Sequence, residues 1–258
     1  MNDEMIKQFS KKLQTGAVFG PFMKTGDPAF VEAAGYGGCD FAVLDMEHGP
    51  VSLQEMQNNI RAAQVSGLLP IIRVSALSET AISQALDIGA GGVQVPQIST
   101  AAQARLAVKA AKFYPCGDRG VCRFVRAAHY STMDKVKYFI EANRALMVIQ
   151  IEGQEAVDNL DEILSVDGID IIFIGPYDLS QSMGLPGQVT NPKVIEQMKK
   201  IVEHARKYRK IVGTFTDSPE MMKLWLDAGV QYISYSVDVG IFAKACADLK
   251  SEFDLLRA

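Results

Sequence analysis

The sequence predicts an α/β protein folded as a closed (β/α)₈ barrel, and three observations point to this fold. Eight short apolar runs recur along the 258 residues. The segments between them carry apolar residues at the three- and four-residue spacing of amphipathic helices, as in Leu53, Met56 and Ile60. The runs are apolar throughout, as in parallel strands that are buried on both faces. We therefore expect one (β/α)₈ domain over residues 1–258.

The strands are expected in this order: residues 17–20, 41–45, 70–74, 92–96, 146–152, 170–176, 210–215 and 232–236. An open, doubly wound sheet is the alternative architecture, but it usually carries a Gly-rich phosphate turn after its first strand. The Gly cluster at 89–92 precedes a strand instead, so we interpret it as a turn.

The longest connection lies between the fourth and fifth strands. It contains an expected helix near 133–144 and the loop 114–131, which carries Arg119, Arg123 and Arg126. Loops of this length are usually functional or form interfaces. Ligand contact and a solvated or interface loop are equally good interpretations here.

Composition excludes several classes of function. The net charge is −4 and no long basic block is present, so nucleic acid is not an expected partner. No stretch of 18 apolar residues indicates a membrane span. The four cysteines form no C-x-x-C pair, which favours free thiols and a cytoplasmic location.

In a barrel of this kind the active site forms at the C-terminal ends of the strands. The polar and turn residues expected there are Asp45, Glu47, His48, Arg73, Gln150, Glu152, Gly175, Pro176, Tyr177 and Asp178. No expected strand ends in a lysine, which disfavours a Schiff-base mechanism.

Glu152 and Asp178 end neighbouring strands, where two carboxylates repel each other unless they are protonated, paired or bridged by a cation. Two carboxylates with waters and ligand oxygens suit Mg²⁺, Mn²⁺ or Co²⁺, and zinc with His48 is an alternative. The alternative is that one or both of these carboxylates have a structural role, either capping a helix or pairing with Arg73.

His48 is the histidine expected at a strand end, where a neutral imidazole can act as a general base. Asp45 or Glu47 could orient it, and a buried structural histidine is the alternative. Arg73 ends an apolar strand, so it needs an anionic partner, either an acid at the same end of the barrel or a ligand. In the second case it can stabilise a developing oxyanion.

Six motifs resemble the HpcH/HpaI aldolase family, of the 2-dehydro-3-deoxyglucarate and 4-hydroxy-2-oxoheptanedioate aldolase type. They are DMEHGP (45–50), PIIRV (70–74), ALDIGAGGVQVP (85–96), YPCGDRGV (114–121), QIE (150–152) and IFIGPYDLS (172–180). The resemblance covers about residues 10–250. It implies a barrel of the phosphoenolpyruvate/pyruvate-binding type, metal-dependent pyruvate aldolase activity and assembly as a homo-hexamer.

The resemblance also implies roles for individual residues. Glu152 and Asp178 become metal ligands, His48 the proton acceptor and Arg73 the stabiliser of the transition state. Gln150 and the turn Gly175, Pro176, Tyr177 and Asp178 become substrate contacts. Asp87 is implied to raise the basicity of the histidine. Because Asp87 ends the helix before the fourth strand, we expect it at the opposite end of the barrel, serving a neighbouring subunit's site, with Asp45 as the local alternative.

The sequence departs from the family in two places. Many members have a tryptophan in the first strand, whereas Val18, Phe19 and Phe22 occupy that stretch here, and Tyr177 stands where a small residue is usual. These changes concern the aldehyde half of the site. The prediction is thus a class II aldolase that uses a divalent metal and no organic cofactor to split a 2-keto-4-hydroxy acid into pyruvate and an aldehyde.

Two alternatives remain open: a decarboxylase or other carbon–carbon lyase with the same site, and a keto-acid-binding module without activity. Apolar residues in the last helical segment, Ile241, Phe242 and Leu249, fit an interface and the core equally well.

Overall fold

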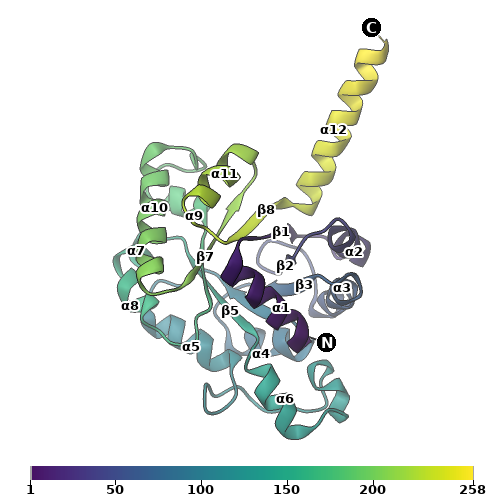
Figure 1. The fold of residues 1–258 in the computed structure, drawn as a ribbon, viewed down its shortest axis with the longest axis vertical. Coiled ribbons are helices and arrows are strands. Elements are labelled where there is room, and N and C mark those ends of the chain that lie inside the picture. The colour runs from purple at the N-terminus through teal and green to yellow at the C-terminus, as the bar shows by residue number, and fades with distance from the viewer. Residues whose placement is uncertain (1, 258) are drawn as a thin grey trace.

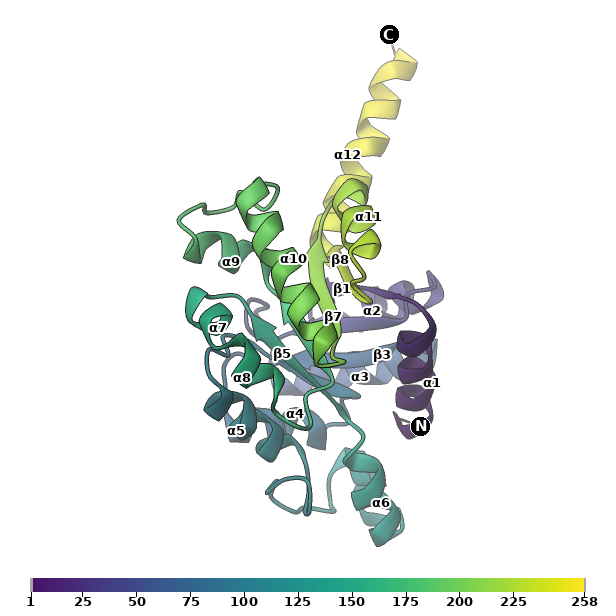
Figure 2. The same ribbon diagram turned by 60° about the vertical axis from the view of Figure 1, so that its left-hand side comes forward.

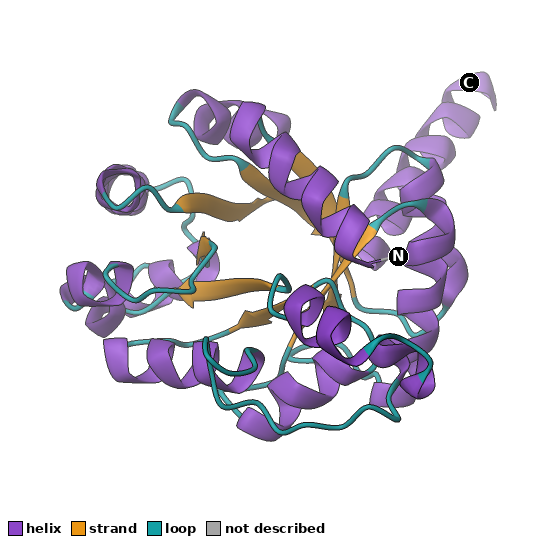
Figure 3. Cartoon of the chain, turned by 60° about the horizontal axis from the view of Figure 1, so that its bottom comes forward, coloured by secondary structure: helices purple, strands orange, loops and turns teal. Residues whose placement is uncertain are grey.

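The computed structural model describes residues 2–257 and contains a closed barrel of parallel strands, which confirms the predicted fold class. The strands are β1 (Val18–Met23), β2 (Phe41–Asp45), β3 (Leu69–Arg73), β4 (Gly92–Val95), β5 (Leu146–Ile151), β6 (Ile171–Ile174), β7 (Ile211–Thr216) and β8 (Tyr232–Val237). Each pairs with its neighbour in sequence, and β8 pairs with β1 to close the barrel. Figure 3 shows the strands at the centre, surrounded by helices.

The helices cover the outside of the barrel (Figures 1 and 2). They are α1 (Asn2–Thr15), α2 (Pro28–Tyr36), α3 (Leu53–Ser66), α4 (Glu79–Asp87), α5 (Ala101–Ala111), the 3₁₀ helix η1 (Arg126–Ser131), α6 (Lys135–Ala142), α7 (Gln154–Asp158), α8 (Leu160–Leu164), α9 (Pro176–Ser182), α10 (Pro192–Lys207), α11 (Pro219–Asp227) and α12 (Asp238–Arg257). Several begin with a side-chain cap; in α3, for example, Ser52 and Glu55 form a capping box.

β1 extends further than the sequence pattern predicted. The Gly20–Pro21 dipeptide is a typical break signal, so the expected strand stopped at residue 20. In the structure the chain continues through Pro21 to Met23, and the register with β8 shifts between Gly20 and Phe22. A bulge of this kind accommodates a proline, which cannot donate to the strand ladder. As a result, Lys24 directly follows a barrel strand.

The barrel interior is packed with aromatic side chains and is closed at its N-terminal end by α1. Phe41 and Tyr232 stack inside the barrel with ring centroids 4.0 Å apart, and Phe9 of α1 packs edge-on against both. A second, larger apolar core fills the space between the strands and the outer helices. Access to the interior is therefore left to the C-terminal ends of the strands.

The long connection between β4 and β5 lies near the N-terminal end of the barrel, where its arginines donate hydrogen bonds to backbone carbonyl groups. Arg123 donates to the carbonyl oxygens of Ser131 and Met133. Arg126 donates to the carbonyl oxygen of Ile88. Arg126 thus anchors the connection to the end of α4, whereas Arg123 stabilises the connection internally.

α12 projects away from the barrel (Figures 1 and 2). Every residue from Ile241 to Arg257 is exposed, including the apolar Phe242, Leu249 and Phe253. The core interpretation of this segment is therefore wrong for the isolated chain. None of the helices within residues 2–257 is long and apolar enough to cross a membrane.

Candidate active site

A cavity of about 370 Å³ opens at the C-terminal ends of the strands. Its lining residues lie on or shortly after every strand except β4: Phe22, Lys24, His48, Arg73, Gln150, Glu152, Phe173, Gly175, Pro176, Tyr177, Asp178, Phe215 and Val237. A larger cavity of about 620 Å³ lies among α1, η1 and α6, and none of the predicted site residues lines it. The predicted metal ligands, base, arginine and substrate contacts instead share the first cavity.

Arg73 and Asp45 form a buried, two-pronged ion pair beside this cavity. Their strands place them directly opposite each other in the parallel register of β2 and β3. Arg73 Nε and Nη2 donate to the two carboxylate oxygens of Asp45 over 2.8 and 2.7 Å. Burial disfavours the Asp45 carboxylate, but the hydrogen bonds and charge of Arg73 outweigh it and hold the pKa of Asp45 below its ordinary value.

Glu47 lies between Arg73 and His48. Its Oε2 is 2.9 Å from Arg73 Nη1 and 3.9 Å from His48 Nε2. Burial raises the pKa of Glu47 above its ordinary value against the charge of Arg73. Of the two acids proposed to orient the histidine, Glu47 is the one beside its ring, because the Asp45 carboxylate faces Arg73. The His48 side chain is 58% exposed, so it is not a buried structural histidine.

Glu152 is held in a buried chain of amides. Only 6% of it is exposed; its Oε1 accepts from the backbone N–H of Gln97, and its Oε2 accepts from Gln150 Nε2. Gln94, inside the barrel, donates to Gln150 Oε1 and so orients the amide of Gln150 toward Glu152. Burial raises the pKa of Glu152 to about 7, and the charge of Asp178 adds to the effect.

Gly175 leaves the space that the Glu152 carboxylate occupies. A Cβ at this residue would lie 2.5 Å from Glu152 Oε2, so a side chain is excluded here. The next residues, Pro176 to Asp178, form the first turn of α9, and Pro176 supplies the fixed φ that suits a helix start. Tyr177 donates from its hydroxyl to Asp217, and burial together with this carboxylate raises the pKa of Tyr177 to about 12.

The donor set fits a hard divalent cation with an incomplete protein shell. Glu152 is shielded and Asp178 is exposed in the cavity, and the charge of Asp178 contributes to the raised pKa of Glu152. Among residues 2–257, no group of three or more His, Cys, Asp or Glu side chains is placed to hold a metal. Two carboxylates with remaining sites for water and substrate oxygens match the usual coordination of Mg²⁺.

Lys24 was missed by the sequence analysis, because no strand ends in a lysine and Lys24 is the residue that directly follows β1. It lines the cavity at the end of β1. Gln97 was missed as well; it adopts a left-handed conformation, with φ of 56°, from which its N–H reaches Glu152. The Thr-Gly-Asp-Pro turn that follows Lys24 could have indicated that the first strand ends beside this lysine. No pattern in the sequence singled out Gln97.

Asp87 lies apart from this cavity. It is the last residue of α4, at the opposite end of the barrel as expected, and its carboxylate pairs with the buried Arg119 over 2.5 Å. Within one chain it is therefore part of a separate ion pair that holds the β4–β5 connection.

Comparisons with known proteins identify the family and confirm the fold. A sequence model of the HpcH/HpaI aldolase/citrate lyase family matches residues 19–245. The 2-keto-3-deoxy-L-rhamnonate aldolase of Escherichia coli is 34% identical over 95% of this chain and 92% of its own. A family protein from Burkholderia cenocepacia superposes with a TM-score of 0.91 at 27% identity over 96% of this chain and 99% of that one. Citrate synthase SbnG superposes with a TM-score of 0.86 at 28% identity over 98% of both chains.

Proposed function

Because the chain belongs to the HpcH/HpaI aldolase/citrate lyase family, we propose that it is a metal-dependent pyruvate aldolase that cleaves a 2-keto-4-hydroxy acid reversibly. The observation that carries this proposal is the meeting of Glu152, Asp178, Arg73 and His48 in one cavity. The name of the E. coli relative, a 2-keto-3-deoxy sugar acid aldolase, supports the same substrate class.

Glu152 and Asp178 would hold the divalent cation, Mg²⁺, Mn²⁺ or Co²⁺. When bound, this cation would polarise the 2-keto group and make it an electron sink. Gln150 keeps the Glu152 carboxylate in place, and the first turn of α9, with its unpaired N–H groups at Tyr177 and Asp178, would contact the substrate carboxylate.

Arg73 would stabilise the charge that develops on the keto oxygen. Asp45 accepts from two of its five N–H donors and Glu47 forms an ion pair with Nη1, which leaves donors for a ligand and fixes the guanidinium beforehand. His48, directly or through water, would accept the proton of the 4-hydroxyl group. The C3–C4 bond then breaks, its electrons form the pyruvate enolate, an aldehyde leaves, and a proton returns to C3.

Deuterium uptake tests this function without knowledge of the aldehyde. Proton NMR of pyruvate in D₂O is followed with metal-stripped protein and again after Mg²⁺ or Mn²⁺ is restored. We expect exchange of the methyl protons only with metal, and none in Glu152→Ala. Glu155→Ala, at an exposed acid three residues away, is the matched control and should exchange normally. Exchange by Glu152→Ala in the presence of a chelator contradicts the metal assignment.

Lys24 makes an imine mechanism a necessary comparison. Borohydride reduction in the presence of pyruvate should leave the mass of the chain unchanged if the enolate forms without a Schiff base. A pyruvate adduct on Lys24 contradicts the metal-enolate proposal.

A second candidate keeps the enolate site but uses another carbon–carbon reaction, such as decarboxylation. The likeness to citrate synthase SbnG favours it, because the name of that protein indicates a different carbon–carbon reaction on the same fold. Turnover of oxaloacetate, without aldol formation from pyruvate and any aldehyde, would select this candidate.

We also propose that the protein is a cytoplasmic homo-oligomer, with the hexamer as the expected state. The accessible area is 12431 Å², against roughly 11,000 Å² for a compact monomer of this mass. Exposed apolar side chains on α12 account for part of the excess and offer a contact for a second copy. The role that the resemblance gives Asp87 requires such a neighbour, so a monomer in light scattering removes that role.

A further inference from the structure

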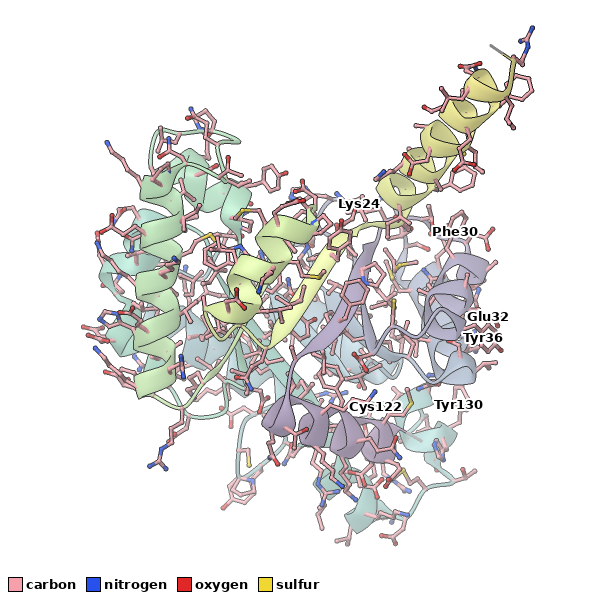
Figure 4. The ribbon with its side chains drawn as sticks, turned by 45° about the horizontal axis from the view of Figure 1, so that its top comes forward. Lys24, Phe30, Glu32, Tyr36, Cys122 and Tyr130 are labelled. Carbon is pink, nitrogen blue, oxygen red and sulfur yellow. The ribbon has the colours of Figure 1, made fainter. Side chains whose placement is uncertain are left out.

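Lys24 is held firmly at the edge of the catalytic cavity. The Asp238 carboxylate, buried at the start of α12, accepts hydrogen bonds from the backbone N–H groups of Lys24 and Thr25 and from the Thr25 hydroxyl, over 2.7–3.1 Å. Asn59 Nδ2 donates to the Thr25 carbonyl oxygen. Figure 4 labels Lys24 beside the base of α12, where the first and last strands end. The backbone that carries this lysine is therefore fixed from both sides.

The Lys24 ammonium group has hydrogen-bonding capacity left for a ligand. Its Nζ is 3.7 Å from Asp45 Oδ2, which is too long for a hydrogen bond. Both Asp45 oxygens already accept from Arg73, and Oδ1 also accepts from the backbone N–H of Glu47 and His48. Within residues 2–257, Nζ donates no hydrogen bond, and 30% of the side chain is exposed. Nothing in the mechanism above uses this cation.

The position of Lys24 in the barrel indicates which half of the substrate it would contact. β1 and β5 are four strands apart in either direction round the closed barrel, so they face each other across it. Glu152 and Asp178 follow β5 and β6, and the pyruvate half belongs on that side. Phe22, Phe215 and Val237 line the cavity from β1, β7 and β8, on the side of Lys24. The side of the cavity that would hold the aldehyde, here called the acceptor side, is therefore lined by these apolar side chains and by Lys24.

We propose that Lys24 determines specificity for an aldehyde that bears a carboxylate group. This inference rests on the proposed aldolase function and names the acceptor class that the function leaves open. When the aldehyde fills the cavity, the Lys24 ammonium group loses contact with water. A charge-assisted hydrogen bond from this group to a carboxylate on the aldehyde compensates for that loss. A doubly charged phosphate is disfavoured, because the carboxyl groups of Glu47 and Asp178 lie near each other in this region and the Lys24 ammonium group already has the Asp45 carboxylate 3.7 Å away.

Two pairs of aldehydes of different length test the subsite with metal-loaded protein. Each pair has a charged and a neutral member of similar size: glyoxylate with glycolaldehyde, and 4-oxobutanoate with butanal. The rate of aldol formation from pyruvate is measured for the wild type, Lys24→Met and Lys24→Arg. Lys207→Met, at an exposed lysine in the last turn of α10, is the matched control for loss of a positive charge.

We expect Lys24→Met to lose roughly tenfold to a hundredfold in kcat/KM with a carboxylate aldehyde and less than about twofold with its neutral partner. Lys24→Arg should recover part of the loss, and Lys207→Met should show none. Pyruvate methyl exchange should be unchanged in Lys207→Met, and the Lys24 variants should keep the wild-type KM for pyruvate in that assay. Equal losses for both members of each pair, no loss, or a raised KM for pyruvate in the exchange assay would overturn the subsite.

The exchange assay also separates this failure from a failure of the proposed function. If wild-type protein exchanges pyruvate protons, but the Lys24 substitutions affect charged and neutral aldehydes equally, the subsite alone is refuted. Wild-type protein that shows neither exchange nor aldol formation with any metal refutes the aldolase, and the acceptor subsite with it.

Discussion

Metal-free protein should lose stability as the pH rises from 5 to 8, and Glu152→Gln should remove that loss. The folded state holds the pKa of Glu152 near about 7, against an ordinary value of 4.5, because the carboxyl is buried. Between these values the unfolded chain is ionised while the folded chain keeps its proton. The unfolded state thus binds fewer protons, and the free energy of unfolding falls as the pH rises through this window.

The magnitude follows from the same two values. Their difference corresponds to about 3 kcal/mol in full. Between pH 5 and pH 8 the expected loss is about 2.5 kcal/mol, because part of the titration lies below pH 5. For a chain of 258 residues this corresponds to a decrease in Tm of roughly 5 °C.

Glu152→Gln is a mild substitution because the amide chain can adapt. Gln94 Oε1 is buried without a hydrogen-bond partner, so the amides of Gln94 and Gln150 can both flip and present an acceptor to the new side chain. Thermal unfolding in chelator at pH 5, 6, 7 and 8 measures the effect, with Glu155→Gln as the exposed control. Parallel pH curves for wild type and Glu152→Gln would refute the reasoning, as would a Glu155→Gln curve that matches Glu152→Gln.

Three further predictions can be checked together. Gly175→Ala should cost about 1–3 kcal/mol in urea unfolding and weaken Mn²⁺ binding in calorimetry, because its Cβ meets the Glu152 carboxylate, whereas Gly153→Ala meets nothing within 4 Å and should do neither. Arg73→Lys should slow pyruvate exchange at least about 100-fold, since lysine cannot reproduce the paired hydrogen bonds to Asp45; an unchanged rate contradicts this. Removal of α12 after its first turn should reduce the mass seen in light scattering, and an unchanged assembly would place the interface elsewhere.

Much of the barrel could be predicted from the sequence because parallel strands buried on both faces have an apolar signature. The expected strand at 41–45 coincides with β2, and the one at 232–236 lies within β8. β1 was cut short because Gly20 and Pro21 resemble a turn, and the bulge that admits them depends on the neighbouring β8. Because of that error Lys24 was expected in a loop and not directly after a barrel strand, so it was not considered as a residue of the active site.

The site could be predicted as a set of residues but not as a set of contacts. Asp45 and Arg73 end strands that are neighbours, yet only the register shows that they lie opposite each other. That pairing leaves Glu47, and not Asp45, beside His48. The backbone N–H of Gln97 depends on a left-handed conformation that no residue type signals. The exposure of α12 was equally hidden, because an apolar helix face looks the same whether it packs on its own chain or on another.

The hydrogen bonds from Lys24 and Thr25 to the Asp238 carboxylate affect the order in which parts of the protein fold during synthesis. Lys24 leaves the ribosome well before Asp238, because the carboxylate that fixes its backbone follows more than two hundred residues later. A nascent chain can build most of its strands while this corner of the barrel is still loose. The acceptor side of the cavity is therefore completed last, when translation has passed β8, and a prematurely terminated chain lacks it.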